Sequence, residues 1–220
     1  MTTYVTMKSR IADELANDGE ITTAQISAAI LTAIKHYERR EWWFNQKVGI
    51  FSTVAAQELY TSSDLTDIPD IVLIQSMLIG SSSTTKKPLA NLDNKNIEDL
   101  QDGSVTGEPV YYSRYADKIR LYPIPSAVYT VMASYIYKLT TLSADGDTNA
   151  WVDECEELIR QAAKRVLSVD VLMADDMAAR FATIEKIVYD RIRKEDKERR
   201  PQQFLRTDLG AARAYNINQG

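Results

Sequence analysis

Residues 149–200 contain two consecutive amphipathic helix patterns, and they constrain the fold more than any other part of the chain. In the first pattern, apolar residues recur at i, i+3 and i+4 and therefore share one helix face. They are Cys155, Leu158, Ile159, Ala162, Val166, Val169 and Met173. The charged residues between them, such as Lys164, are expected to face water. This spacing predicts a helix over 152–173.

The second pattern follows a short break at 173–176, where an aspartate can cap the next helix. Its apolar face consists of Met177, Phe181, Ile184, Val188 and Ile192. The pattern predicts a helix over 176–199, because cations suit the last turns of a helix and Pro201 stops it. Two apolar faces on a short connection pack together and need a third helical partner.

Two further helices are predicted near the beginning of the chain, over 3–16 and 22–40. The second begins at a capping box formed by Thr22 and Gln25 and continues with apolar residues at helical spacing. It is the expected third partner of the C-terminal pair. We therefore expect one three-helix core containing Ile30, Leu158, Ala162, Val166, Phe181 and Ile184.

Residues 48–139 change to the alternating pattern and turn residues of a β region. The clearest hairpin joins 110–115 to 118–122. The longest predicted strand, over 128–139, is apolar or aromatic on both faces, which fits a sheet lying on helices. The chain therefore predicts an α+β fold: mainly a helical bundle with an inserted antiparallel β-sheet, forming a single domain over 1–200.

Residues 201–220 lack a regular apolar pattern and are predicted to form an extended C-terminal tail. The larger apolar side chains of the tail are Phe204, Leu205, Leu209, Tyr215 and Ile217. They provide too little apolar surface to offset the entropy of ordering this segment alone. We therefore expect the tail to become ordered only against a partner.

Composition restricts the possible functions. Acidic residues outnumber basic ones by 31 to 26, which argues against a protein whose main role is to grip nucleic acid. A lone cysteine excludes an intrachain disulfide and fits a reducing compartment. No apolar run approaches about 18 residues, so no membrane span is expected, and the first residues show no secretory signal.

Few residues of the chain are candidates for a catalytic role. His36 has no nucleophile or second histidine at useful spacing, and Cys155 lies on an apolar helix face, which favours a buried small hydrophobe. We predict no catalytic, cofactor-binding or metal site and no enzymatic activity. The remaining enzyme hypothesis is a carboxylate hydrolase that uses Glu154, Glu156 and Glu157, although acids are typical of a first helical turn.

One loop approaches the ligand spacing of a calcium site. Positions 1, 3, 5 and 12 of the calcium-loop count are Asp145, Asp147, Asn149 and Glu156. However, position 6 is Ala150 instead of glycine, and the preceding segment is a strand. The favoured interpretation is a strand-to-helix loop in which Thr148 or Asn149 caps the next helix.

Two surface hypotheses remain open. Residues 42–44, two tryptophans and a phenylalanine, favour a core plug between helix and sheet, with an intersubunit contact, a base-stacking platform or a membrane anchor as alternatives. The basic run at 191–200 is typical of a solvated helix end. The alternative function is a cytoplasmic regulatory module that binds nucleic acid through this basic end.

Several stretches resemble the head–tail adaptor proteins of tailed bacteriophages. They are DKIRLYPIP at 117–125, the following strand with Tyr129, DTNAW at 147–151 before a long helix, KSRIAD at 8–13, and the strand after Pro69 and Asp70. The resemblance extends over most of residues 1–200.

The resemblance implies a structural virion protein at the head–tail interface, made in the host cytoplasm. It implies a homo-oligomeric ring, commonly of twelve subunits, beneath the portal protein and against a tail-side connector or tail component. Genomic DNA would pass through the ring without specific binding, which suits a net charge of −5. No cofactor is implied. The tail residues Phe204, Leu205, Leu209, Tyr215 and Ile217 are expected to bind the portal.

Overall fold

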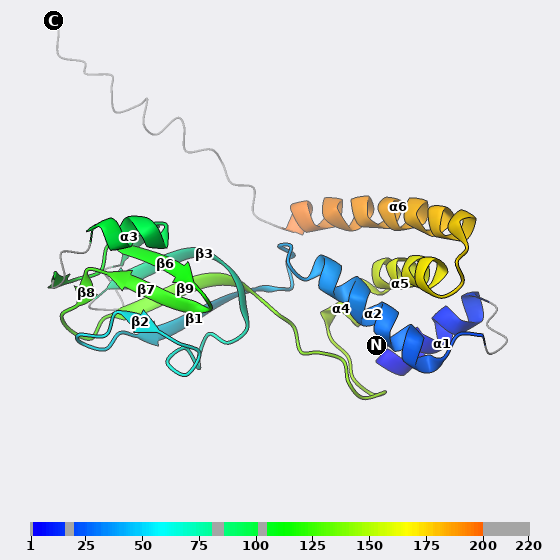
Figure 1. Cartoon of the computed structure of the whole chain (residues 1–220), viewed down its shortest axis with the longest axis horizontal. Helices are drawn as coiled ribbons and strands as arrows, with labels where there is room; N and C mark the ends of the chain where they lie inside the picture. Colours follow the sequence, from blue (N-terminus) through cyan, green and yellow to red (C-terminus); the bar gives the residue numbers. More distant parts are fainter. Residues whose placement is uncertain (1, 16–19, 81–85, 101–104, 200–220) are drawn as a thin grey trace, which may run out of the picture.

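The computed structural model describes residues 2–15, 20–80, 86–100 and 105–199. A group of helices lies at one end of the molecule and a curled sheet at the other, and two segments of chain connect them (Figure 1). The helices both precede and follow the sheet in the sequence, so the sheet is inserted between them. This confirms the predicted α+β fold class.

As far as the structure describes it, the helical half contains five helices, and the second of them starts at the predicted capping box. Its helices are α1 (Tyr4–Glu14), α2 (Thr23–Tyr37), α4 (Ala150–Asp153), α5 (Glu156–Asp170) and α6 (Asp175–Arg199). The Thr22 backbone N–H donates to Gln25 Oε1 at 2.7 Å, and the Gln25 N–H donates to Thr22 Oγ1 at 3.3 Å. These are the two hydrogen bonds of the predicted capping box.

The prediction of one continuous helix over 152–173 is wrong, because two helices form there. Asn149 Oδ1 accepts hydrogen bonds from the backbone N–H groups of Trp151 and Val152, which starts the short α4. The chain then leaves helical geometry at Cys155, with φ −119° and ψ 23°, before α5 begins. Val152 and Cys155 are both buried, so the apolar spacing continues across the break and could not reveal it.

Helix α5 is the central helix of this half, because it contacts α1, α2 and α6. It buries most of its circumference, so the prediction of one apolar and one polar face was wrong. Lys164, expected to face water, is only 5% exposed, whereas Val169 and Met173 of the predicted stripe are exposed. The buried residues are Leu158, Ile159, Gln161, Ala162, Ala163, Lys164, Leu167 and Ser168.

The predicted three-helix core forms only in part. Ile30, Leu158 and Ala162 lie inside the buried cluster, whereas Val166 and Ile184 pack against it from partly exposed positions. Phe181 lies at the edge, where its ring centroid is 4.7 Å from Lys164 Nζ. The core therefore centres on α2 and α5, and α6 covers one side.

The sheet is mixed instead of wholly antiparallel. Its order is β1 (Gln46–Ser52), β9 (Thr130–Tyr137), β3 (Ile71–Gly80), β4 (Lys87–Asn91), β6 (Tyr111–Tyr115), β7 (Lys118–Tyr122) and β2 (Leu59–Tyr60). Within the described part of this seven-stranded sheet, the pair β4–β6 is parallel and the other pairs are antiparallel. The chain between these two strands contains α3 (Asn94–Leu100), and such a crossover returns the second strand in the direction of the first.

Two smaller features complete this half. The predicted hairpin of β6 and β7 forms, with Ala116 and Asp117 in the turn at φ 47° and 61°. A separate two-stranded sheet pairs β5 (Thr106–Gly107) with β8 (Ile124–Pro125).

The curled sheet encloses a second hydrophobic core of its own. The inward residues of strand β9 are Val131, Ala133 and Tyr135, and they pack among side chains of the same sheet. The expectation that this strand lies on helices was therefore wrong, because the sheet covers its inner face by curling. Gly49 on β1 allows the curl: a Cβ at this position would lie 2.1 Å from Ile68 Cγ2.

Candidate interaction surfaces

The five apolar tail residues predicted to bind a portal lie outside the described residues. They are Phe204, Leu205, Leu209, Tyr215 and Ile217. The structure does describe the root of this segment. Helix α6 runs back from the far tip of the helical half and ends near the junction with the sheet half (Figure 1). The chain after Arg199 therefore starts near the middle of the molecule.

The last turns of α6 are fixed to the segment between α2 and β1. Asp196 is 1% exposed and accepts hydrogen bonds from the Trp43 backbone N–H at 2.9 Å and from Arg193 Nη1 at 2.8 Å. Arg193 Nη1 also donates to the Glu41 carbonyl at 2.8 Å. Buried charged hydrogen bonds of this kind hold the end of α6 in one position relative to the junction.

Three arginines of the basic run are paired within the chain. Arg191 pairs with Glu157 and Arg193 with Asp196, while Arg199 lies 3.6 Å from Glu154. The Arg199 guanidinium also lies 4.4 Å from the ring centroid of Trp43. These contacts reduce the positive charge that this helix end can offer to nucleic acid.

Trp42 is a structural residue of the helical core. It is fully buried, and its Nε1 donates to the Tyr37 carbonyl at 3.1 Å. Its ring meets that of Trp151 edge-on at 5.8 Å, and Phe44 stacks on it at 6.0 Å. The core-plug interpretation therefore holds for Trp42. No helix within the described ranges combines the length and apolarity needed to cross a membrane.

An apolar row crosses four strands on the outer face of the sheet. Ile50 is paired with Met132, Met132 with Leu78, and Leu78 with Pro88. Because directly paired residues point to the same side of a sheet, these side chains adjoin one another. Ile50 is 49% exposed, and Lys86 Nζ lies 3.3 Å from Met132 Sδ. We call Ile50, Met132, Leu78 and Pro88 the outer row.

The outer row was not predicted from the sequence. Alternation places Ile50 and Leu78 on one face of their own strands, but it does not tell which strands are neighbours or in which register. On β1, Val48 and Ile50 alternate as apolar residues in the sequence, but only the structure shows that both are exposed.

The family model described as SU10 adaptor protein matches residues 2–206. The chain belongs to the SU10 adaptor protein family. This is a family of phage head–tail adaptors, so the resemblance is confirmed and the protein has a structural role in the virion. No curated protein matches the chain.

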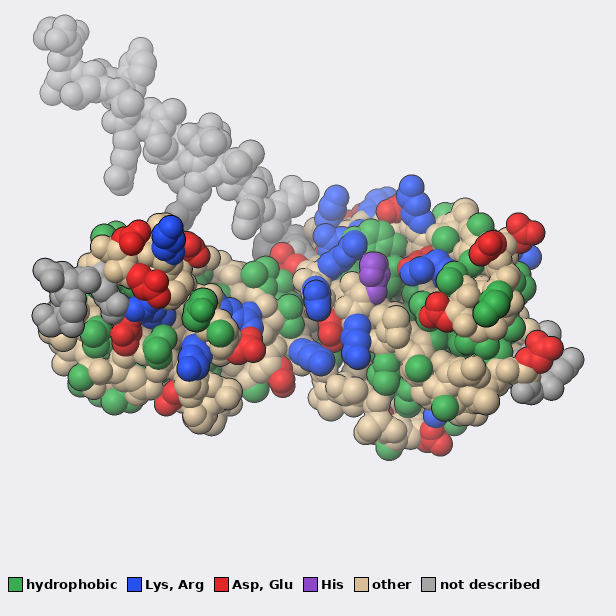
Figure 2. All heavy atoms as spheres, in the orientation of Figure 1, with side chains coloured by type: hydrophobic (Ala, Val, Ile, Leu, Met, Phe, Trp, Pro, Cys, Tyr) green, Lys and Arg blue, Asp and Glu red, His purple; other side chains and the backbone are tan. Residues whose placement is uncertain are grey.

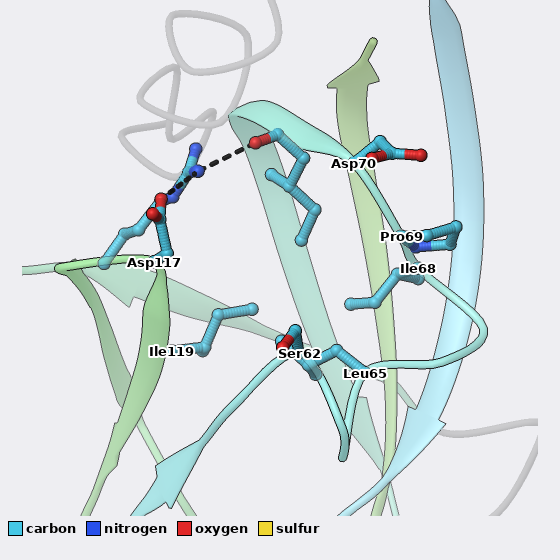
Figure 3. Close-up of a pocket in the computed structure, with 9 residues that line it drawn as sticks. Ser62, Leu65, Ile68, Pro69, Asp70, Asp117 and Ile119 are labelled. Atoms are coloured by element: carbon cyan, nitrogen blue, oxygen red, sulfur yellow. Dashed lines mark hydrogen bonds and ion pairs between the residues drawn. The ribbon is translucent and has the colours of Figure 1, made fainter. Parts of the chain in front are cut away.

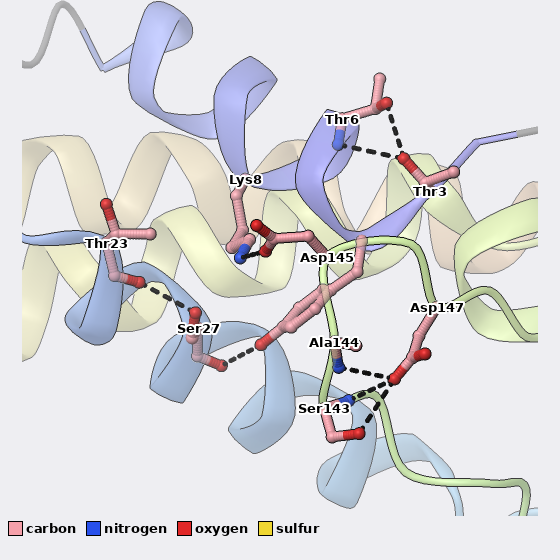
Figure 4. A network of polar contacts seen from close by, with 10 residues as sticks. Thr3, Thr6, Lys8, Thr23, Ser27, Ser143, Ala144, Asp145 and Asp147 are labelled. Carbon is pink, nitrogen blue, oxygen red and sulfur yellow. Dashed lines mark hydrogen bonds and ion pairs between the residues drawn. The ribbon is translucent and has the colours of Figure 1, made fainter.

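In this adaptor, the candidate calcium loop joins α1 to the chain before α4 (Figure 4). Asp147 Oδ2 accepts from the backbone N–H groups of Ser143 and Ala144, both at 2.7 Å. These hydrogen bonds to the carboxylate lower the pKa of Asp147. Backbone bonds from Tyr4 and Val5 to the carbonyls of residues 147 and 145 attach α1 to the same loop.

The other candidate calcium ligands have separate partners. Asp145 pairs with Lys8 at 2.5 Å, Glu156 pairs with Arg10 at 2.5 Å, and Asn149 caps α4. The loop thus has the strand-to-helix role that the favoured interpretation gave it. Within the described ranges, no three acidic, histidine or cysteine side chains lie together as a metal-binding group would.

The adaptor's remaining reactive residues are likewise used by the fold. Cys155 is buried, and burial raises the pKa of its thiol to about 12. The Glu154, Glu156 and Glu157 side chains each pair with a different arginine, so they do not form a carboxylate pair. His36 is exposed, and its ring meets that of Tyr37 edge-on.

A pocket of about 290 Å³ lies at the seam of the curled sheet, between the loop after β2 and the β6–β7 hairpin (Figure 3). Leu65, Ile68 and Ile119 form its apolar wall. Arg114 crosses the seam, donating to the Ile71 carbonyl at 2.7 Å and to Asp117 Oδ1 at 3.3 Å. The arginine therefore closes the seam between two strands that are not paired with each other.

Basic side chains gather where the helical half meets the sheet half (Figure 2). Lys35 from α2 and Lys138 after β9 line one hollow there, together with Leu31 and Leu139. Arg40 donates to the Tyr189 hydroxyl at 2.6 Å. We call Lys35 and Lys138 the junction basic patch.

Proposed function

We propose that this adaptor assembles as a ring beneath the portal, connects the capsid to the tail, and surrounds the path of the DNA. The match to the adaptor family over residues 2–206 carries this proposal. The shape of the chain supports it, because the two halves offer different surfaces. A closed ring requires such unlike surfaces, since each subunit contacts its two neighbours differently. Twelve subunits are what the family resemblance implies.

The C-terminal residues are proposed to bind the portal. Their root is fixed beside the junction by Asp196, Arg193 and Arg199. The 21 residues after Arg199 could reach about 70 Å if extended. The apolar tail residues could then contact a partner well beyond the subunit's own surface. Repetition around a ring would convert weak single contacts into strong attachment.

The charge of the chain supports passage of DNA instead of DNA capture. Its net charge is −5, and a protein that neutralises few phosphates gains little from counterion release. The junction basic patch favours the alternative of a nucleic-acid-binding module, although through residues other than the basic run at 191–200. The two functions differ in what the purified protein binds.

The test is to mix the purified adaptor with its purified portal and image both by electron microscopy. We expect an additional ring on the portal and no retention of duplex DNA at physiological salt. If the adaptor neither joins the portal nor forms a ring, the proposal fails. Salt-sensitive DNA binding that Lys35→Glu together with Lys138→Glu abolishes would instead support the alternative.

A further inference from the structure

The packing and backbone of this chain do not explain why residue 173 is a methionine. It lies between α5 and α6, is 85% exposed, and has a positive φ of 48°. This left-handed backbone region favours glycine, because a Cβ atom makes it costly. The other described non-glycine residues with positive φ are alanines and aspartates. Neither burial nor backbone conformation therefore favours a methionine at 173.

Met173 is flanked in the sequence by further exposed apolar residues. Val169 at the end of α5 and Met177 in the first turn of α6 are also exposed apolar side chains. We call Val169, Met173 and Met177 the turn patch. Asp170, Asp175 and Asp176 are close to these residues in the sequence and are exposed. The patch is thus apolar with three neighbouring carboxylates, at the tip of the helical half farthest from the sheet (Figure 1).

The outer row of the sheet has the complementary composition. It is apolar over four strands, and the ammonium group of Lys86 lies against Met132. The turn patch and the outer row lie on opposite halves of an elongated molecule (Figure 1). One chain cannot bring its own two surfaces together, so a contact between them would join one copy to the next.

We propose that the turn patch of one subunit docks on the outer row of the neighbouring subunit, with Met173 as the central apolar contact. This rests on the proposed ring and identifies its subunit interface. A flexible methionine side chain adapts well to an irregular apolar surface. Strained backbone conformations concentrate at such functional positions. Lys86 would face the carboxylates of Asp170, Asp175 and Asp176, which sets the orientation.

Cysteine cross-linking tests which surfaces meet. Ile50→Cys and Met173→Cys are prepared separately, with Cys155 left in place because it is buried. Under assembly conditions with the portal, oxidation of the mixture should give covalent dimers, and neither variant alone should do so. The double variant should give a ladder of covalent multimers. Ile187→Cys, at a 65% exposed position on α6, replaces Met173→Cys as the matched control and should not cross-link to Ile50→Cys.

Met173→Gly tests the central apolar contact without introducing a covalent bond. Glycine suits the positive φ, so the melting temperature of the isolated chain should stay the same or rise. The protein concentration needed for ring assembly should increase at least tenfold, because the apolar contact is lost. Ala116→Gly is the matched control: it changes another left-handed residue, with φ 47°, and should leave assembly unchanged.

The outcomes separate this interface from the proposed function. If the wild-type protein forms rings, but Met173→Gly assembles equally well and the mixture gives no cross-links, the interface is wrong and the ring stands. Cross-links within Ile50→Cys alone would indicate a two-fold contact and would also overturn it. If the wild-type protein forms no ring with or without portal, both proposals fail.

Discussion

Gly49 is the residue on which the curl of the sheet depends most directly. An added Cβ would lie 2.1 Å from Ile68 Cγ2 and 3.1 Å from the Asp67 carbonyl oxygen. Gly49→Ala should therefore destabilise the protein by about 1–3 kcal/mol, as overpacking of a filled core does. Chemical denaturation measures this loss. Gly146→Ala is the control, because a Cβ added there would meet no atom within 4 Å, and an equal loss in both variants would contradict the packing argument.

Cys155 should make stability depend on alkaline pH. Burial raises the pKa of its thiol from 9.0 to about 12, so the folded state favours the protonated form. Its contribution is fully present below pH 9 and is lost as pH rises towards 12. Between these values the free energy of unfolding should fall more steeply than in Cys155→Ala, by roughly 1.4 kcal/mol per pH unit. Identical pH slopes in urea denaturation would show that the thiol is not buried as described.

Roles that depend on contacts between sequence neighbours could be predicted from the sequence. Roles that depend on contacts between distant parts of the chain could not. The capping box of Thr22 and Gln25 and the burial of Cys155 depend on neighbours within one or two helical turns. Lys164 is different, because its partner is distant in the sequence. Lys164 Nζ donates to Oε2 of Glu14, on α1, at 2.6 Å. Periodicity contains no information about that partner.

Helix α5 should tolerate a charge at a partly exposed position better than at a buried one. Ala162 is buried inside the helical core, whereas Val166 is only partly buried against it. Ala162→Asp should therefore cost at least about 3 kcal/mol, because it buries an unpaired charge. Val166→Asp should cost clearly less, since its carboxylate can reach water. Thermal melting of both variants checks the order, and a larger loss in Val166→Asp would place the wrong face of α5 in the core.

The sequence predicted which segments form helices and strands better than it predicted their breaks and neighbours. The longer helices and the β6–β7 hairpin each arise from local spacing and turn residues. The break between α4 and α5 was missed because apolar residues lie on both sides of it. The parallel pairing of β4 and β6 was missed because it depends on how the chain returns after α3.

At the scale of the whole molecule, the chain builds two separate cores on one continuous backbone. One cluster of buried residues belongs to the helices and the other to the curled sheet. The sequence indicated the α+β composition but implied a sheet resting on helices. Composition and alternation cannot separate these arrangements, because both bury the same strand residues. The separation leaves the outer row and the turn patch exposed at different ends, as a ring contact between unlike surfaces needs.

The segment after α6 should be needed for attachment to the portal and not for the stability of the fold. Deletion of residues 202–220 should leave the melting temperature unchanged, because the contacts of Asp196 and Arg199 that hold the end of α6 remain. It should abolish attachment to portal-containing capsids, because each buried apolar side chain contributes roughly 1.5–3 kcal/mol before ordering costs. A full-length variant in which Phe204, Leu205, Leu209, Tyr215 and Ile217 are replaced by serine is the matched control for chain length. Co-sedimentation with capsids measures attachment. If the serine variant attaches normally while the deletion does not, the segment acts as a spacer, and normal attachment by both variants would remove it from portal binding.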